Sequence, residues 1–490
     1  MTIIVACSLS RWSHDSDIFT LLFVSRKDLF EQLFTEGFPS AFVLSYQVIF
    51  LPMKLEFQHK TSSPAFPFDI ISLIIDIVGE NDDTDLLNEL ALVSHSFLQL
   101  CTKHIFANID LHDGNMRHNT KASSKKGFIK LVKNKPDVAR YIRKLKYQLD
   151  KDDCSNSRQS SPTNSVSVND DDQLLPTLSN FLATIPSLGS FDIYGNCMDW
   201  RSLDSSLTSS FLHLMHLPTI KSIDLNSINN FPGYGLFGAN NLHRLDIGQM
   251  MSDTDFEEDE DGTLGMVLES EVMPKLRELR IAEAYELTMK LVLAKMEDGR
   301  PAFKFVDLRL LSVGLAESRD IQIFGYFINN ARFLETLQLS ITQTQSLLGL
   351  HAVLAPRART LKSIELSVNS LETVVGTVRL PLGGFCRELE AMAGRNILEE
   401  VIFEIFLELG DKEEVIGPIV QNVEKALVRP GFPALQRVII KFSCLERMSN
   451  SDEEKLAAML ESSIPEKYLS NLLEHPSVDL YCTADLWTFS

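Results

Sequence analysis

The sequence predicts an α/β fold: a curved solenoid with parallel strands on its concave side and helices on its convex side, preceded by a small helical module. Two observations lead to this prediction. The phrase apolar-x-x-apolar-x-apolar occurs ten times between residues 142 and 440, and helix-like segments separate several of its copies. Three short amphipathic segments precede these copies, between residues 67 and 106.

The charge balance of the chain argues against nucleic acid as a partner. Acidic residues outnumber basic ones 66 to 46, which gives a formal net charge of −20 over 490 residues. Proteins hold phosphate backbones with clustered Lys and Arg, and the one basic stretch here, 121–146, is interpreted as a solvated surface. The hydrophobic fraction of 44% is sufficient for a large buried core.

Cysteine usage and hydropathy indicate a protein of the cytosol or nucleus that does not contact a membrane. The seven cysteines are scattered and never spaced C-x-x-C, so neither a disulfide framework nor a metal site is expected. No apolar run approaches the roughly 20 residues of a membrane helix. The N-terminus lacks the basic region of a signal peptide, and no motif indicates a cofactor.

The first segment, 1–62, has a structure that the sequence leaves uncertain. Apolar residues between Ile18 and Phe34 fit one side of a helix, and 41–51 is an apolar run too short to span a membrane. We expect Met53 to be the functional start of the protein, because the first intelligible module begins shortly after it.

The next segment is expected to form three short helices. Pro67 suits the first turn of a helix, and apolar residues follow it at helical spacing as far as Val78. Asp83 or Thr84 can cap the second helix, and Ser94 can cap the third. So small a module buries little surface by itself, so a partner or a following domain should cover its remaining apolar side chains.

Composition divides the chain further. The helical module occupies 63–110, and a connector with the first strand follows at 111–150. Residues 151–172, rich in Ser, Asn and Asp, are expected to be a disordered insertion. The remainder, 173–490, is the repeat array, which carries an acidic loop at 252–262 where seven of eleven residues are acidic.

The repeated phrase carries the prediction of parallel strands. Its fifth position is polar or charged in eight of ten copies, whereas the fourth and sixth are apolar. Because successive side chains of a strand face opposite sides, the fourth and sixth should face the core and the third and fifth solvent. The copies begin at Ile142, Leu188, Ile220, Leu242, Leu276, Phe305, Leu334, Leu361, Leu398 and Leu435.

Stacking of these units accounts for the pattern. One such strand cannot bury its own apolar face, whereas neighbouring strands in a parallel ladder can. The alternative is a doubly wound α/β domain, which also alternates helices and strands. Buried strands of that fold are typically continuous apolar runs, so the polar fifth position favours the solenoid.

Residues of the helical module and the array together resemble a known family. FPFDIISLIIDIV, from Phe66, and LLNELALVSHSF, ending at Phe97, resemble the F-box motif with its Leu-Pro start and Val-(Cys/Ser)-x-x-Trp end; Phe97 replaces the Trp. The array is similar to an irregular leucine-rich-repeat solenoid, with Asn at the ladder position only at Asn196 and Asn369. This arrangement is that of substrate receptors in Skp–cullin–F-box ubiquitin ligases, especially divergent fungal ones.

The resemblance implies a non-catalytic protein whose helical module binds a Skp-family adaptor and whose array binds a protein substrate. A plain helix-packing role is the alternative for each implied adaptor-binding residue, and for Ile74 and Leu87 the two roles are equally well supported. The residues implied to contribute to the adaptor surface are Pro67, Ile71, Ile74, Leu87, Val93 and Phe97.

Contacts with the substrate are expected at the third and fifth positions of the phrase, on the concave face. Charges of both signs suit a protein surface, although these residues could equally serve only to keep the face soluble. At Ile402 and Ile439 the fifth position becomes apolar. The candidate residues are Asp192, Asp224, Arg244, Asp246, Glu278, Arg280, Asp307, Arg309, Gln338 and Glu365.

Motifs of enzymes are present only in the wrong context, so no catalytic residue is assigned. Gly233-x-Gly235-x-x-Gly238 matches the dinucleotide fingerprint but does not open a helix directly after a strand, so a flexible loop is predicted there. His213 and His216 are interpreted as packing or surface residues. Two other functions stay open: an interaction scaffold with no ubiquitin-ligase role, and an enzyme whose residues only the fold brings together.

Overall fold

The computed structural model consists of two compact units, Met1–Ile109 with Lys135–Arg143, and Asp110–Asn134 with Lys144–Ser490. Each unit is described by itself. The residues described are 21–25, 47–51, 68–81, 83–112, 125–150, 153, 174–248, 274–282, 284–295, 300–315, 318–341, 349–368, 381–407, 413–428, 431–444 and 450–486.

Three helices of the first unit confirm the predicted helical module. They are α1 (Phe68–Glu80), α2 (Thr84–Ala91) and α3 (His95–Ile105). Two predicted caps are present: the Asp83 carboxylate accepts from Leu86 N at 3.1 Å, and the Ser94 hydroxyl accepts from Phe97 N at 3.3 Å. Each cap satisfies an amide that the first helical turn leaves unpaired.

A small core joins these three helices. Ile75 and Val78 of α1, Leu87 of α2 and Cys101 of α3 are buried together. Where α1 meets α3, Gly79 faces the ring of His104, and a Cβ at this position would overlap the ring. Helix α1 therefore approaches α3 closely at its last turn.

The same unit contains a two-stranded antiparallel pair, β1 (Leu21–Ser25) and β2 (Gln47–Leu51). A helix was expected over 18–34, and β1 shows that this expectation is wrong for its five residues. The segment LLFVS pairs in register with QVIFL, so two apolar runs separated in sequence form backbone hydrogen bonds to each other. Apolar runs this short do not distinguish a helix from a strand by periodicity.

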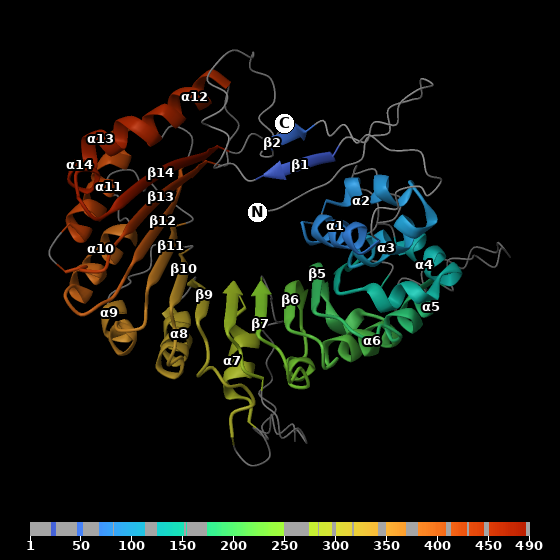
Figure 1. Ribbon diagram of the computed structural model, residues 1–490. Coiled ribbons are helices and arrows are strands. Elements are labelled where there is room, and N and C mark those ends of the chain that lie inside the picture. The colour runs from blue at the N-terminus through green and yellow to red at the C-terminus, as the bar shows by residue number, and fades with distance from the viewer. Residues whose placement is uncertain are drawn as a thin grey trace. The chain divides into compact units, whose positions relative to one another are not determined.

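The second unit is built on a parallel sheet of twelve strands whose spatial order follows the chain from β3 to β14 (Figure 1). A doubly wound sheet reverses its strand order, and this sheet does not. The strands are β3 (Asn108–Leu111), β4 (Lys144–Gln148), β5 (Ser190–Asp199), β6 (Ser222–Asn229), β7 (Arg244–Gly248), β8 (Glu278–Ala282), β9 (Leu310–Leu315), β10 (Thr336–Ile341), β11 (Ser363–Val368), β12 (Glu400–Leu407), β13 (Arg437–Cys444) and β14 (Asp479–Leu486).

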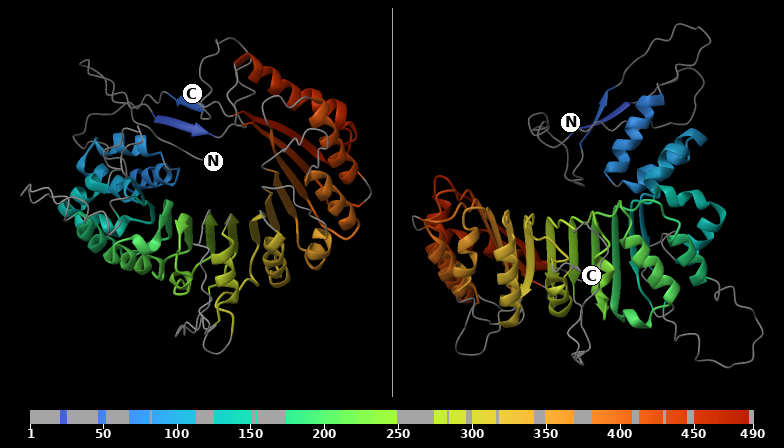
Figure 2. Two further views of the ribbon diagram at one scale, coloured as in Figure 1. Left: turned by 180° about the vertical axis from the view of Figure 1, so that it is seen from behind. Right: turned by 90° about the horizontal axis from the view of Figure 1, so that it is seen from below.

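Helices connect the strands and cover one face of this sheet, which curves so that the opposite face is concave (Figure 2). No helix in the described ranges is both long and apolar enough to cross a membrane. The helices of this unit are α4 (Lys125–Asn134), α5 (Leu174–Leu182), α6 (Ser205–Met215), α7 (Tyr285–Leu293), α8 (Ser318–Asn330), α9 (Leu350–Leu354), α10 (Pro381–Met392), α11 (Glu413–Leu427), α12 (Asn450–Ala458), α13 (Ile464–Tyr468) and α14 (Ser470–Leu473).

An apolar row crosses the sheet on its helix-covered face. Adjacent strands are in register, so one buried residue of each strand lies beside the corresponding residue of the next. Burial of each such side chain contributes about 1.5–3 kcal/mol. The row consists of Leu145, Phe191, Ile223, Leu245, Leu279, Leu311, Leu337, Ile364, Val401 and Val438, each at most 1% exposed.

The predicted register is wrong in one strand. Leu311, not Leu308, lies beside Leu279 and Leu337, so the copy of the phrase in β9 begins at Leu308 rather than Phe305. Both frames satisfy the apolar pattern, and only the longer alternation Leu311, Val313, Leu315 distinguishes them. Asp307 and Arg309 therefore lie before the strand and not on it.

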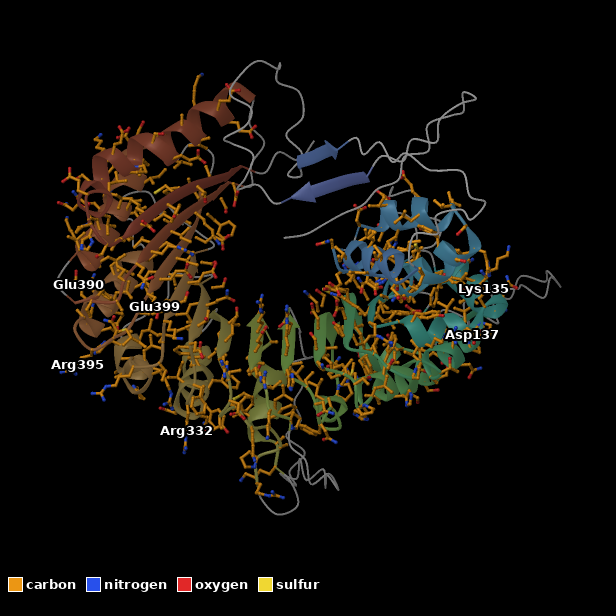
Figure 3. The ribbon with its side chains drawn as sticks, viewed as in Figure 1. Lys135, Asp137, Arg332, Glu390, Arg395 and Glu399 are labelled. Carbon is orange, nitrogen blue, oxygen red and sulfur yellow. The ribbon has the colours of Figure 1, made fainter. Side chains whose placement is uncertain are left out.

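A recurring pair of backbone hydrogen bonds at the start of β6 to β13 supports this register. The carbonyl of the second phrase position accepts two amides from the next unit: Lys221 O accepts from His243 N at 2.8 Å and Arg244 N at 3.0 Å. The Arg309 carbonyl accepts the same pair of bonds, and so does that of Glu399, which is labelled in Figure 3. Each of these strands is thus fixed to its neighbour before the ladder begins.

The sequence pattern did not predict two of the strands, β3 and β14, and it placed the start of the disordered insertion too early. β3 precedes the first phrase, and β14 has Ser477 and Cys482 where the phrase requires large apolar residues. Asp153, placed in the disordered insertion, is 2% exposed and belongs to the fold. The rest of 151–172 and the acidic loop 252–262 lie outside the described residues.

A buried ionic cluster explains the position of Asp153. Lys125 pairs with Asp150 and, at 2.7 Å, with Asp153, while Tyr147 donates to Asp153 at 2.8 Å. Burial is the largest influence on Asp153 and raises the pKa of its carboxyl group, although Lys125 opposes the shift. Lys125 is consequently a core residue, contrary to the prediction that 121–146 is a solvated surface.

The glycine-rich segment is also ordered. Gly233–Leu236 forms a short 3-10 helix whose Gly235 carbonyl lies 3.0 Å from His216 Nε2. Added Cβ atoms at Gly235 and Gly238 would meet Leu212 and His216 within 2.7 Å. Because these glycines have no side chains, the segment can lie close to α6 and to His216, the C-terminal cap of that helix. The prediction of a flexible loop is therefore wrong. The prediction that His216 is a packing or surface residue is confirmed.

Substitution of Gly79 by Ala should destabilise the helical module by about 1–3 kcal/mol, because the added methyl overlaps His104, whose Nε2 lies 2.8 Å from Asp76 Oδ1. Hydrogen exchange of peptides covering residues 68–105 measures the effect. Gly325→Ala in α8 is the matched control, since its nearest atom would be Val353 Cγ1 at 4.0 Å. This change should stabilise its helix by up to about 1 kcal/mol, and equal exchange for Gly79→Ala and wild type would contradict the assigned contact.

Candidate functional site

The sheet of the second unit has a polar inner face, opposite the helices. Buried and less buried residues alternate along β7 to β12, and along β6 as far as Asn226, and the less buried residue of each pair faces inward. We call the aligned fifth phrase positions the fifth-position row. In strand order it consists of Lys146, Asp192, Asp224, Asp246, Arg280, Ser312, Gln338, Glu365, Ile402, Ile439 and Tyr481.

Three aspartates stand side by side in this row. Asp192, Asp224 and Asp246 occupy adjacent strands, which are about 4.8 Å apart in a sheet. The outer two are paired: Asp192 with Lys144 at 3.0 Å, and Asp246 with Arg244 at 2.6 Å. The predicted residues of β5 to β7 are therefore brought together, with Asp192 only 5% exposed.

Asp224 lies between the two ion pairs and accepts a hydrogen bond from the Tyr194 hydroxyl at 3.0 Å. Burial raises the pKa of the Asp224 carboxyl group, and the charges of Asp246 and Asp192 raise it further. Burial and the Asp224 carboxylate in turn raise the pKa of the Tyr194 phenol. Sequence reasoning missed Tyr194 because it lies one residue past the end of the phrase.

Two arginines extend the charged cluster toward β8. Arg244 Nε lies 3.9 Å from Glu278, and Arg280 Nε lies 3.9 Å from Asp246. Arg280 Nε is buried and has no hydrogen-bond partner among the described residues. The strands from β4 to β8 thus present charges of both signs, and among the described residues ion pairs within the face compensate Asp192 and Asp246 but not Asp224.

The central strands carry smaller polar groups. Gln338 donates to Glu365 at 2.7 Å, and Lys441 reaches the same carboxylate at 3.5 Å from two strands away. Ser312 occupies the fifth-position row in β9, where Arg309 was expected. The expectation that Asp307 and Arg309 lie on the inner face is therefore wrong. Arg309 instead pairs with Glu335 at 3.3 Å before the strands begin.

The fifth-position row becomes apolar in its last three strands. Ile402, Ile439 and Tyr481 lie in register on β12, β13 and β14, and Tyr481 is 49% exposed. The sequence indicated the first two residues. Tyr481 was missed because β14 does not contain the full phrase.

The helical module presents a second surface, formed by apolar side chains that its own core does not cover. Leu73 is 58% exposed, Val93 55% and Leu92 87%, and Ile70 and Leu98 are also exposed. Of the residues implied by resemblance, Val93 is exposed, Ile71, Ile74 and Phe97 are half-buried, and Leu87 is in the core. Pro67 lies outside the described residues.

On α1, the residues that the resemblance implied for the adaptor surface are not the residues that the structure leaves exposed. Ile70 and Leu73 are exposed, whereas Ile71 and Ile74 pack against the core cluster. The apolar face of this amphipathic helix is too broad for the sequence to show which of its residues meet the neighbouring helices and which remain uncovered.

In comparisons with known proteins, no family model and no curated protein matches the chain. Within the described ranges, no three His, Cys, Asp or Glu side chains are placed to hold a metal ion. The geometry itself supports binding through charged, hydroxyl and apolar groups on the inner face, and through apolar groups on the module.

Replacing Asp224 by Asn should raise the stability of the second unit at pH 7 by up to about 1 kcal/mol, because it removes a charge that burial disfavours and that faces like charges on the adjacent strands. The folded-state pKa of Asp224 lies above its unfolded value, so ionisation lowers stability as pH rises through these values. The gain should therefore vanish near pH 3, where the carboxyl group is protonated in both states. Urea denaturation at both pH values measures it.

Asp246→Asn is the matched control in the neighbouring strand. It removes the 2.6 Å ion pair with Arg244 and should lower stability at pH 7. Stabilisation of similar size by both substitutions would contradict the assigned difference between the two carboxylates.

Proposed function

We propose that this chain is the non-catalytic substrate-recognition subunit of a Skp–cullin–F-box E3 ubiquitin ligase. In this proposal the helical module binds the Skp-family adaptor, and the parallel sheet is an irregular leucine-rich-repeat solenoid that holds a protein substrate. The observation that carries it is the exposed apolar surface of the module. Five of the nine large apolar side chains that are exposed in the described residues belong to this module, three in its helices and two in the turn between α2 and α3.

The module supports docking because its fold and its surface use different residues. Ile75, Val78, Leu87 and Cys101 hold the helices together, which leaves the exposed side chains free to enter a partner. Burial of apolar side chains is the dominant favourable contribution to most protein association. An uncovered set of aliphatic residues on a stable helical frame is typical of a docking surface.

The sheet supports substrate binding through its concave, polar inner face. Like a solenoid, its successive units contact mainly their neighbours, and such arrays provide extended concave surfaces for proteins. Burial and the charges of Asp246 and Asp192 also disfavour the ionised carboxylate of Asp224. A binding function accounts for charges that folding alone disfavours.

The proposed mechanism is positional. A substrate held on the solenoid has its lysines kept near the ligase's catalytic subunit, which raises their effective concentration without any new chemistry. Side chains of this chain would bind and orient proteins, and the transfer of ubiquitin would take place on other subunits.

Co-expression of the full chain with a Skp-family adaptor tests the proposal. Copurification of a stable complex is expected for wild type. Leu73→Asp and Val93→Asp should each weaken it at least about tenfold, because each places a charge against an apolar surface. Binding is measured by titration of purified adaptor, and hydrogen exchange confirms that each variant keeps its core.

Phe333→Asp provides the control, since Phe333 is 54% exposed on the second unit and plays no part in the proposed adaptor surface. It should bind the adaptor like wild type. Absence of any complex with wild type would instead favour an interaction scaffold that has no role in a ubiquitin ligase.

A further inference from the structure

The parallel sheet ends in an open edge at β14, the last strand in Figure 1. Asp479 N donates to Gln436 O at 2.8 Å, so the amides of Asp479, Tyr481 and Thr483 point toward β13. Those of Leu480 and Cys482 point the other way, because amides alternate along a strand. Neither has a hydrogen-bond partner among the described residues, so this edge retains donors and acceptors for one more strand.

The far end of the edge is occupied by the chain itself. Glu461, in the helical segment before α13, accepts a hydrogen bond from Ala484 N at 3.0 Å. Ala484 is the next outward-pointing residue after Cys482, which confirms the direction of the alternation. Proteins commonly protect edge strands with charged side chains, and here the protection begins at Ala484 and leaves 479–483 open.

An apolar surface adjoins the open edge. On the inner face, Tyr481 is the last member of the apolar part of the fifth-position row, after Ile402 and Ile439. Each interior isoleucine has an apolar neighbour in the following strand, whereas Tyr481 has none and is 49% exposed. A strand added at this edge would place a side chain directly beside Tyr481, within cross-strand contact distance.

The charges at the edge indicate which charge the partner strand should carry. Asp479 and Asp485 lie on the same face as Tyr481, both are exposed, and neither has an ion-pair partner among the described residues. The guanidinium of Arg437, which is the register partner of Asp479 on β13, is bonded to Glu400 at 3.2 Å. An added strand with Lys or Arg beside Asp479 would supply the missing charge.

These features disfavour a second copy of this chain as the occupant. Two-fold pairing of β14 with itself, centred on Cys482 so that the whole strand is used, would place Asp479 of one copy opposite Asp485 of the other, twice. Like charges directly opposite each other destabilise a strand pair. A partner of opposite charge avoids this repulsion.

We propose that the outer edge of β14, residues 479–483, is a strand-addition site for an extended segment of a partner protein, with a large aliphatic residue beside Tyr481 and a Lys or Arg beside Asp479. Main-chain hydrogen bonds supply affinity in this mode of recognition, and alternate side chains supply specificity. The inference rests on the proposed substrate binding and adds the chemistry of the bound segment. Binding at this edge does not depend on the Skp-family adaptor.

Fluorescence anisotropy of a labelled peptide TKTITKT with the full chain, without adaptor, tests the site. The sequence is symmetric, so a lysine meets Asp479 whether the peptide runs parallel or antiparallel. Saturable binding is expected, and replacing the central isoleucine by serine should weaken it about tenfold. Indifference to that replacement would overturn the proposal.

A charge-reversal pair locates the contact. Asp479→Lys should weaken TKTITKT about fivefold and restore comparable binding to TETITET. Asp137→Lys, at the exposed position labelled in Figure 3, is the control and should leave both affinities unchanged. Equal effects of the two substitutions would place the peptide elsewhere and overturn the assignment.

N-methylated peptides establish strand pairing independently of any change in the protein. Methylation at the lysine and isoleucine amides blocks a parallel addition, whereas methylation at the threonine amides blocks an antiparallel one. Loss of binding for one methylated peptide, with retention for the other, is the expected result. If both methylated peptides still bind, strand addition is excluded. If the chain forms a dimer and the unmethylated peptide disrupts it, the edge is instead assigned to a second copy of the chain. Neither result bears on the adaptor complex, so the two proposals fail separately.

Discussion

The constraint on which the sheet unit depends is that no strand can bury its own apolar side chains. Leu245, Leu279 and Leu337 are covered only because neighbouring strands lie in register with them and helices lie above. The backbone supports that register at the start of β6 to β13, where a carbonyl of one unit accepts two amides from the following unit. Packing and hydrogen bonding therefore select the same alignment, which limits the ways in which the strands can slip.

This constraint explains how much could be predicted from the sequence. Nine of the ten phrases identify their strands correctly, because the alternation of apolar and polar residues is imposed by burial on one face. The phrase at Phe305 fails because Leu308 satisfies two overlapping frames. β14 was missed because an edge strand with one neighbour tolerates Ser477 and Cys482 where interior strands require larger apolar groups.

The functional surfaces were less accessible to sequence reasoning, for a related reason. The phrase identifies which residues face inward, so Asp192, Asp224 and Asp246 were placed together correctly. It contains no information about residues beyond its last position, and Tyr194 was missed. Lys125 and Asp153 also belong to segments of solvated composition, yet each is buried because the other neutralises it. Pairing between distant residues leaves no periodic trace in the sequence.

In the second unit, two of the four large apolar side chains that are exposed among the described residues lie at the end of the array. Tyr481, on the last strand, is 49% exposed, and Leu473, in the helix before that strand, is 48% exposed. The helical module also exposes apolar side chains, because three short helices enclose too few side chains to cover their own apolar surface. A partner that covered either place would gain the same burial that stabilises the interior of the sheet. The proposed adaptor surface and the proposed strand-addition site thus share one physical feature, which is apolar side chains without a covering neighbour among the described residues.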